Sequence, residues 1–151
     1  MKNGITVIEL MVVLAIIALM GILMAPAIGE WMDNYRIKQA TRDVVSTLQL
    51  ARMRAISARL EYRVVFNVAN ERYQLERGDL PSASTTWTLE GDVKSCPRSV
   101  DIDNTNFTSD IVEFNPDGSS SNGSIFIDNA KGKQYRIRVT RLGRPAIQEG
   151  W

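Results

Sequence analysis

The residue with the clearest chemistry in this chain is Glu9, the single charged side chain between Lys2 and Glu30. From Ile5 to Ile28 every other residue is apolar or small, apart from the hydroxyl of Thr6. A carboxylate in such a segment costs about 2.5–3.5 kcal/mol at the centre of a bilayer and less near its edge. We therefore expect Glu9 to meet a group of opposite charge, because pairing makes both charges tolerable in an apolar setting.

The chain lacks the side chains on which most enzymes depend. It contains no histidine, which removes the commonest general base, the usual catalytic metal ligand and the His-activated nucleophiles. Its single cysteine, Cys96, cannot form an intrachain disulfide and has no histidine to activate it. No glycine-rich phosphate loop is present either. We expect a protein that is not an enzyme, with no catalytic residues and no cofactor.

One cluster of oxygen-bearing side chains needs a separate interpretation. It comprises Asp101, Asp103, Asn104, Asn106 and Asp110. Such groups can bind calcium, a hard cation that prefers oxygen ligands. The cluster lacks both the glycine and the closing glutamate of an EF-hand loop, so a solvated loop is the preferred interpretation and no metal is expected.

Charge is unevenly distributed along the chain, although its formal net value is only +1. Residues 131–151 carry six basic side chains and one acidic, whereas residues 60–130 carry five basic and twelve acidic. In a strand over 134–141, Arg136 and Arg138 share one face and leave Tyr135, Ile137 and Val139 for the core. The basic face either complements an acidic surface or binds the phosphates of DNA.

The elements that position these residues begin with the apolar segment at 5–29. A helix over this range is roughly 36 Å long, enough to cross a bilayer core of roughly 30 Å. The segment therefore predicts a single transmembrane pass, and Lys2 on its short N-terminal side places that end in the cytoplasm. Residues 1–4 are too few for an ordinary secretory signal. Pro26 is expected to kink the helix.

The helix is predicted to continue through residues 30–59, which contain neither Pro nor Gly. Apolar residues recur there at steps of three and four, the spacing of one helical face. They are Ile37, Ala40, Val44, Leu48, Ala51 and Ala55. The two segments together form one helix of about 55 residues, roughly 80 Å long, whose amphipathic half lies on a globular head.

The head, residues 60–151, is predicted to be rich in β-strands. Alternating runs indicate a hairpin of strands at 62–68 and 72–76. Further strands are expected at 86–90, 100–103, 111–115, 124–128, 134–141 and 145–148, separated by turn residues. The long stretch from Gly78 to Pro97 is expected to be a mobile surface loop. The predicted fold is α+β, a long helix packed on a mostly antiparallel sheet or two small sheets.

Gly4 and the nine residues after it, Ile5-Thr6-Val7-Ile8-Glu9-Leu10-Met11-Val12-Val13, resemble a known processing junction. It is the class III leader junction of type IV pilins and type II secretion pseudopilins. The resemblance implies that a prepilin peptidase cuts after Gly4 and methylates Ile5, although the first mature residue in this superfamily is usually Phe. It also implies that Glu9 pairs with the N-terminal amine of a neighbouring subunit, and that Pro26 is the helix-kinking proline of many pilins.

A second resemblance lies in the C-terminal half of the chain. Residues 112–118, 124–127 and 136–144 are similar to the GspH/FimT family of minor pilins and pseudopilins. This resemblance implies the pilin fold and a structural subunit at or near the tip of a type IV pilus or a type II secretion pseudopilus. The implied partners are other pilin-type subunits, the prepilin peptidase and the bacterial inner membrane, with the head in the periplasm.

The alternative function is that of a DNA-binding minor pilin in DNA uptake. Its contacts would come from the C-terminal basic residues Arg136, Arg138, Arg141 and Arg144. In DNA-binding FimT relatives the corresponding element is Gly-Arg-x-Arg. This chain has Gly143-Arg144-Pro145-Ala146, so the second arginine is missing. The departure favours the structural subunit over the DNA-binding one.

Overall fold

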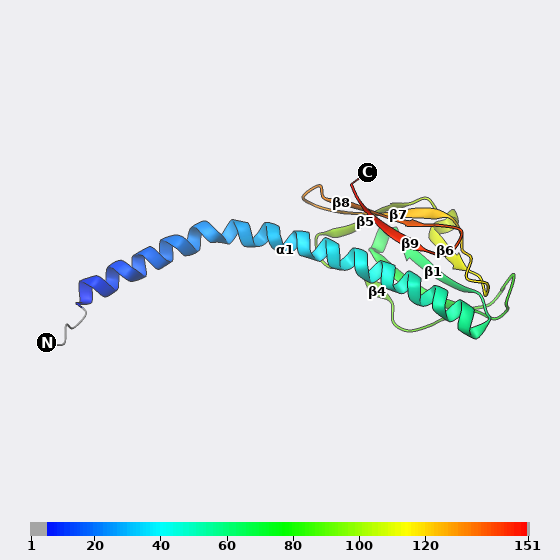
Figure 1. Cartoon of the computed structure of the whole chain (residues 1–151). Helices are drawn as coiled ribbons and strands as arrows, with labels where there is room; N and C mark the ends of the chain where they lie inside the picture. Colours follow the sequence, from blue (N-terminus) through cyan, green and yellow to red (C-terminus); the bar gives the residue numbers. More distant parts are fainter. Residues whose placement is uncertain (1–5, 151) are drawn as a thin grey trace. The chain divides into compact units, whose positions relative to one another are not determined.

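The computed structural model describes residues 6–150, with side chains at 6–21, 29 and 31–150. The chain divides into two compact units, Met1–Met32 and Asp33–Trp151. A single helix, α1 (Val7–Ala58), runs through the described part of the first unit and forms the start of the second (Figure 1). All strands belong to the second unit, which is the head.

Helix α1 is continuous over its 52 residues, so the predicted single long helix is confirmed. The helix passes through Pro26, where the backbone lacks one donor. The kink expected there stays a prediction. The helix ends before Arg59, whose φ of +56° is the left-handed conformation that stops a helix.

In the first unit, the large apolar side chains of α1 are uncovered. From Val7 to Met20 they are 48–77% exposed, and they point in all directions around the helix. Apolar surfaces of this size mark places where a protein meets another apolar surface. Within the described residues, no helical stretch combines the length and the hydropathy needed to cross a bilayer. The transmembrane segment expected over 5–29 stays a prediction.

In the second unit, the predicted stripe of α1 is buried. All six residues of the stripe, from Ile37 to Ala55, are at most 3% exposed. Two threonines beside the stripe are also buried, and their hydroxyls donate to carbonyls one turn back: Thr41 to Ile37 O at 2.8 Å and Thr47 to Asp43 O at 3.0 Å. The polar groups on this face are therefore satisfied within the helix.

The first sheet of the head contains five antiparallel strands. They are β1 (Tyr62–Asn67), β2 (Arg72–Gly78), β3 (Trp87–Leu89), β4 (Lys94–Ser95) and β6 (Ile111–Phe114). The order is β3-β2-β1-β6, and β4 also pairs with β2. The predicted β1–β2 hairpin is confirmed; its link is a short 3-10 turn, Val68–Asn70, followed by Glu71 at φ +53°.

The second sheet contains four antiparallel strands in the order β5-β7-β8-β9. They are β5 (Val100–Thr105), β7 (Gly123–Asn129), β8 (Gln134–Val139) and β9 (Pro145–Glu149). A bulge interrupts β5 between Ile102 and Asn104. The α+β prediction with two small antiparallel sheets is therefore confirmed.

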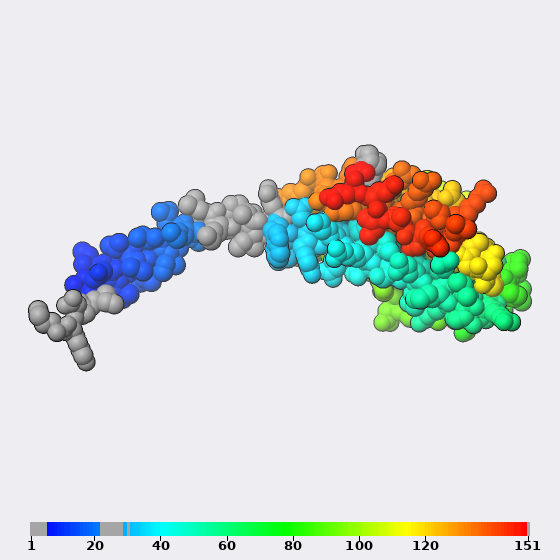
Figure 2. Space-filling view, viewed as in Figure 1, coloured from blue at the N-terminus to red at the C-terminus, as the bar shows by residue number. Residues whose placement is uncertain are grey.

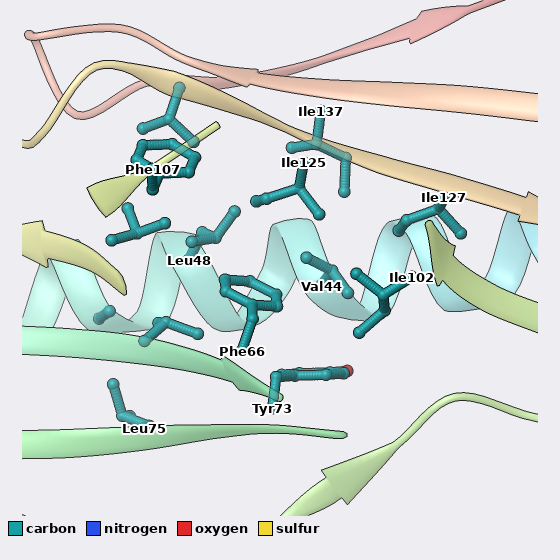
Figure 3. Packing of buried hydrophobic residues seen from close by; sticks show 14 of the residues in the cluster. Val44, Leu48, Phe66, Tyr73, Leu75, Ile102, Phe107, Ile125, Ile127 and Ile137 are labelled. Atoms are coloured by element: carbon teal, nitrogen blue, oxygen red, sulfur yellow. The ribbon is translucent and has the colours of Figure 1, made fainter. Parts of the chain in front are cut away.

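Helix α1 packs against both sheets through one core. Figure 3 shows Val44 and Leu48 on the helix facing side chains from each sheet. From the first sheet come Phe66, Tyr73 and Leu75; from the second come Ile102, Ile125, Ile127 and Ile137. Figure 2 shows the C-terminal strand, in red, lying along the second half of α1, in cyan.

Three sequence expectations need correction. Strand β8 ends at Val139 rather than 141, because the chain turns at Thr140–Arg144. The oxygen-bearing cluster expected to form a solvated loop lies partly on strand β5. The strand predicted at 100–103 is confirmed and extends to Thr105, so Asp101, Asp103 and Asn104 are strand residues. The 78–97 stretch contains β3 and β4 and is held by side-chain acceptors. Glu61 accepts from Ala83 N and Ser84 N, and Asp79 accepts from Thr85 N and Thr86 N.

Candidate functional site

Glu9 lies in the first turn of α1 and takes part in a reciprocal cap. The backbone N of Thr6 donates to Glu9 Oε2 at 3.5 Å, and Glu9 N donates to Thr6 Oγ1 at 3.3 Å. This pair has the pattern of a capping box, in which a Thr and a Glu three residues later satisfy each other's free N–H groups. The Glu9 side chain is exposed and keeps acceptor capacity for another donor.

The sequence itself contains the signal for this cap. Thr6-x-x-Glu9 before an apolar run is a helix-start pattern that can be read without a structure. The proposed cleavage residues Gly4 and Ile5 lie outside the described residues. Pro26 lies within α1, and its side chain is not among those described.

The structure separates the four predicted basic residues into two pairs. Arg136 and Arg138 share the outer face of β8, as predicted, because Tyr135, Ile137 and Val139 fill the core. Arg136 is engaged internally: its Nε donates to Ser124 Oγ at 2.9 Å and its guanidinium lies 5.5 Å from the centroid of the Phe126 ring. Arg138 is exposed.

The other pair, Arg141 and Arg144, flanks the turn between β8 and β9 and is exposed. The turn is closed by Gly143 N donating to Thr140 O at 2.8 Å and by Thr140 N donating to Arg144 O at 3.3 Å. Arg144 borders a crevice of about 420 Å³ between α1 and this turn. The crevice is lined by Gln49, Arg52, Met53, Gly143, Arg144 and Pro145.

A contact that the sequence did not reveal joins this turn to the helix. Arg52, on α1, donates from Nε to the carbonyl of Gly118 at 3.1 Å. Gly143 packs against the same two groups: a Cβ added to it would lie 2.3 Å from Gly118 O and 2.8 Å from Arg52 Nε. We infer that Gly143 is required because no side chain fits between the helix arginine and the β6–β7 turn.

The remaining chemistry-bearing residues form no reactive centre in the described part of the chain. No group of three or more Cys, Asp and Glu residues there has a metal-binding arrangement. Cys96 is half-buried, and burial raises the pKa of its thiol to about 11, with Glu71 and Asp101 adding to the effect. At neutral pH this cysteine is a protonated, weakly reactive thiol.

The Gly143 contact predicts a specific loss of stability. Gly143→Ala should lower the free energy of unfolding by about 2 kcal/mol or more, because the new Cβ overlaps Gly118 and also strains a residue at φ +69°. Gly132→Ala is the matched control, since φ there is +78° with nothing within 4 Å. It should cost only about 1 kcal/mol, the strain alone. Equal losses in chemical denaturation would show that the close packing has no energetic role.

Comparisons with known proteins agree with this architecture. The chain matches the family model described as Type II transport protein GspH over residues 40–143, from the buried stripe of α1 to the β8–β9 turn. It is 26% identical over 141 residues to the type II secretion system protein H of Xanthomonas campestris pv. campestris. That alignment covers 91% of this chain and 77% of the relative.

Two solved structures are similar in fold. The minor pseudopilin EpsH of the Vibrio cholerae type 2 secretion system gives a TM-score of 0.62 at 13% identity, over 76% of this chain and 97% of that one. The type IV minor pilin FimU of Pseudomonas aeruginosa gives a TM-score of 0.55 at 15% identity, over 80% of this chain and 92% of that one. The predicted GspH/FimT resemblance is thus confirmed. The chain belongs to the GspH family of type II transport proteins.

Proposed function

We propose that this subunit assembles at or near the tip of a type II secretion pseudopilus and performs no catalysis. The family match over residues 40–143 carries the proposal, because it covers most of the helix stripe and most of the head together. The similarity to the secretion protein of Xanthomonas campestris favours a secretion filament, while the fold shared with FimU keeps a type IV pilus as the second candidate.

The uncovered apolar part of α1 is buried in two environments in turn, first the membrane and then the filament. Before assembly, we propose that residues 5–29 anchor the chain in the inner membrane, with the head in the periplasm. In the filament, the same side chains from Val7 to Met20 pack against the helices of neighbouring subunits. In both settings these apolar side chains leave water, which stabilises the inserted state.

Glu9 then supplies the specific contact. Among the residues that the structure describes, its carboxylate accepts one long bond, from Thr6 N at 3.5 Å. We propose that the N-terminal amine of a neighbouring subunit, created by cleavage after Gly4, takes up the remaining acceptor capacity. The pair is favourable in an apolar surrounding because each charge removes the cost of leaving the other unpaired.

The processing step is tested by mass. Intact-mass measurement of the chain from its native host should show loss of residues 1–4 and one added methyl group on Ile5. Gly4→Val should block cleavage, because the peptidase needs a small residue at the cut, and should leave the full-length unmethylated chain. Recovery of only unprocessed wild-type chain would contradict the processing proposal.

The charge of Glu9 is tested apart from its capping role. Glu9→Gln keeps a side-chain acceptor at this capping-box position but removes the charge, whereas Thr6→Ala removes the cap's hydroxyl and keeps the charge. We expect Glu9→Gln and Glu9→Val to enter the membrane yet fail to complement a deletion strain in secretion. Thr6→Ala should retain most of the activity. Full complementation by Glu9→Gln would show that Glu9 acts only as a local helix cap and that its charge is not needed for assembly.

DNA binding, the alternative function, is tested by its salt dependence. Arg138, Arg141 and Arg144 are exposed, but Arg136 is already bonded to Ser124. For the detergent-solubilised full chain we expect binding to duplex DNA weaker than roughly 100 µM at physiological salt. Micromolar binding that falls steeply with salt, and is weakened by Arg144→Ala for every sequence tested, would instead support a phosphate-binding surface.

A further inference from the structure

The crevice between α1 and the β8–β9 turn contains two arginines and no acidic side chain. It has a volume of about 420 Å³, and Arg52 and Arg144 are the charged residues of its lining. Neither arginine forms an ion pair with a residue that the structure describes. A carboxylate that entered this crevice would therefore meet two cations and no competing acid in the lining.

Arg52 is held in a position suited to binding an acid. Its Nε donates to Gly118 O at 3.1 Å, and a Cβ added to Gly143 would lie only 2.9 Å from Arg52 Cδ. The side chain is half-buried, and its two Nη groups have no hydrogen-bond partner among the described residues. A guanidinium fixed in this way keeps donors for a carboxylate and loses little side-chain freedom when it binds one.

Exposed apolar side chains border the two arginines. Met53 lines the crevice and is 61% exposed, and Leu142, which precedes the lining residue Gly143, is 69% exposed. They are the two most exposed large apolar side chains that the structure describes in the head. Ile56, one turn after Arg52 on α1, is 45% exposed. Met and Arg are enriched in protein–protein interfaces, whereas the phosphates of DNA offer no surface on which apolar side chains pack.

We propose that this crevice docks an acidic segment of a neighbouring subunit whose sequence differs from that of this chain. A carboxylate of the neighbour lies between Arg52 and Arg144, and apolar side chains beside that carboxylate cover Met53 and Leu142. Such a contact rests on the proposed function, because a subunit at the tip of a filament has subunits of other kinds as neighbours. The charge of the crevice and its uncovered apolar rim determine the chemistry of the occupant.

A photoreactive side chain in the crevice tests which neighbour occupies it. Gln49 lines the crevice and is exposed, so p-benzoylphenylalanine can replace it in the full chain without changing the proposed contact residues. Illumination of the native host should join this chain to a different subunit of the filament. Mass spectrometry should place the bond near an Asp or Glu flanked by apolar residues. A cross-link to a second copy of this chain, or no cross-link in cells that secrete, would overturn the proposal.

Two substitutions separate the contribution of charge from that of the apolar rim. Arg144→Glu and Leu142→Ser should each lower the yield of the cross-link by about tenfold or more, as expected for side chains at the centre of an interface. Arg144 is replaced rather than Arg52, because Arg52 also holds the β6–β7 turn through Gly118.

Matched controls make the same changes outside the crevice. Arg98→Glu and Leu89→Ser alter exposed side chains that do not line it, and they should leave the cross-link yield unchanged. All four substitutions replace exposed side chains, so each variant should keep the melting temperature of the wild-type chain. Losses of cross-link as large in the controls as in the crevice variants would overturn the proposal.

Exchange of charge tests recognition directly. Replacing the mapped acid of the neighbour by arginine should lower the yield, and combining that change with Arg144→Glu should restore it. No restoration would overturn the proposal. Duplex DNA binding that is lost with Arg144→Glu but kept with Leu142→Ser would assign the turn to phosphate binding and would also overturn it.

A deletion strain distinguishes failure of this contact from failure of the proposed function. If cells that lack the chain secrete normally, the proposed function fails, and the contact that rests on it fails too. If these cells do not secrete but Arg144→Glu and Leu142→Ser both complement fully, and no cross-link forms, the proposed function stands and the crevice contact does not.

Discussion

The burial of one helical stripe between two small sheets is the interaction on which the rest of the head depends. Ile37, Val44 and Leu48 are fully buried, and around them pack the inward-facing residues of both sheets. Neither sheet pairs with the other through a shared strand. Apart from the core, they are linked by Ser120, which donates to Arg141 O and Thr140 O, and by Ile102 N on β5, which donates to Glu71 Oε2 beside β2. The helix is therefore a central structural element of the head rather than a stalk below it.

The two halves of this helix differ in how far their apolar side chains are covered. In the second half the stripe from Ile37 to Ala55 is covered by the head, whereas from Val7 to Met20 the large apolar residues are uncovered in the single chain. Glu9 lies in the uncovered part. An unpaired charge is unfavourable once the apolar side chains around it leave water, so Glu9 selects a partner of opposite charge. The arrangement suits a subunit that folds its head alone and completes the burial of its N-terminal half on joining a membrane or a filament.

Features set by local spacing could be predicted from the sequence, and features set by long-range packing could not. The stripe from Ile37 to Ala55 and the β1–β2 hairpin follow from periodicity, so both were confirmed. Strand β4 is too short to show periodicity. The Arg52–Gly118–Gly143 contact joins residues far apart in sequence, and no spacing rule identifies it. The roles of Gly4, Ile5, Glu9 and Pro26 stay predictions from the superfamily resemblance.

One pair of identical substitutions tests this division of the helix most directly. Leu48 is fully buried and Leu14 is 57% exposed, so Leu48→Ala and Leu14→Ala make the same chemical change in the two halves. The account predicts that Leu48→Ala lowers the free energy of unfolding of the head, followed by tryptophan fluorescence in denaturant, by about 3 kcal/mol. Leu14→Ala should change it by less than about 0.5 kcal/mol. Equal losses for the two variants, or no loss for Leu48→Ala, would contradict it.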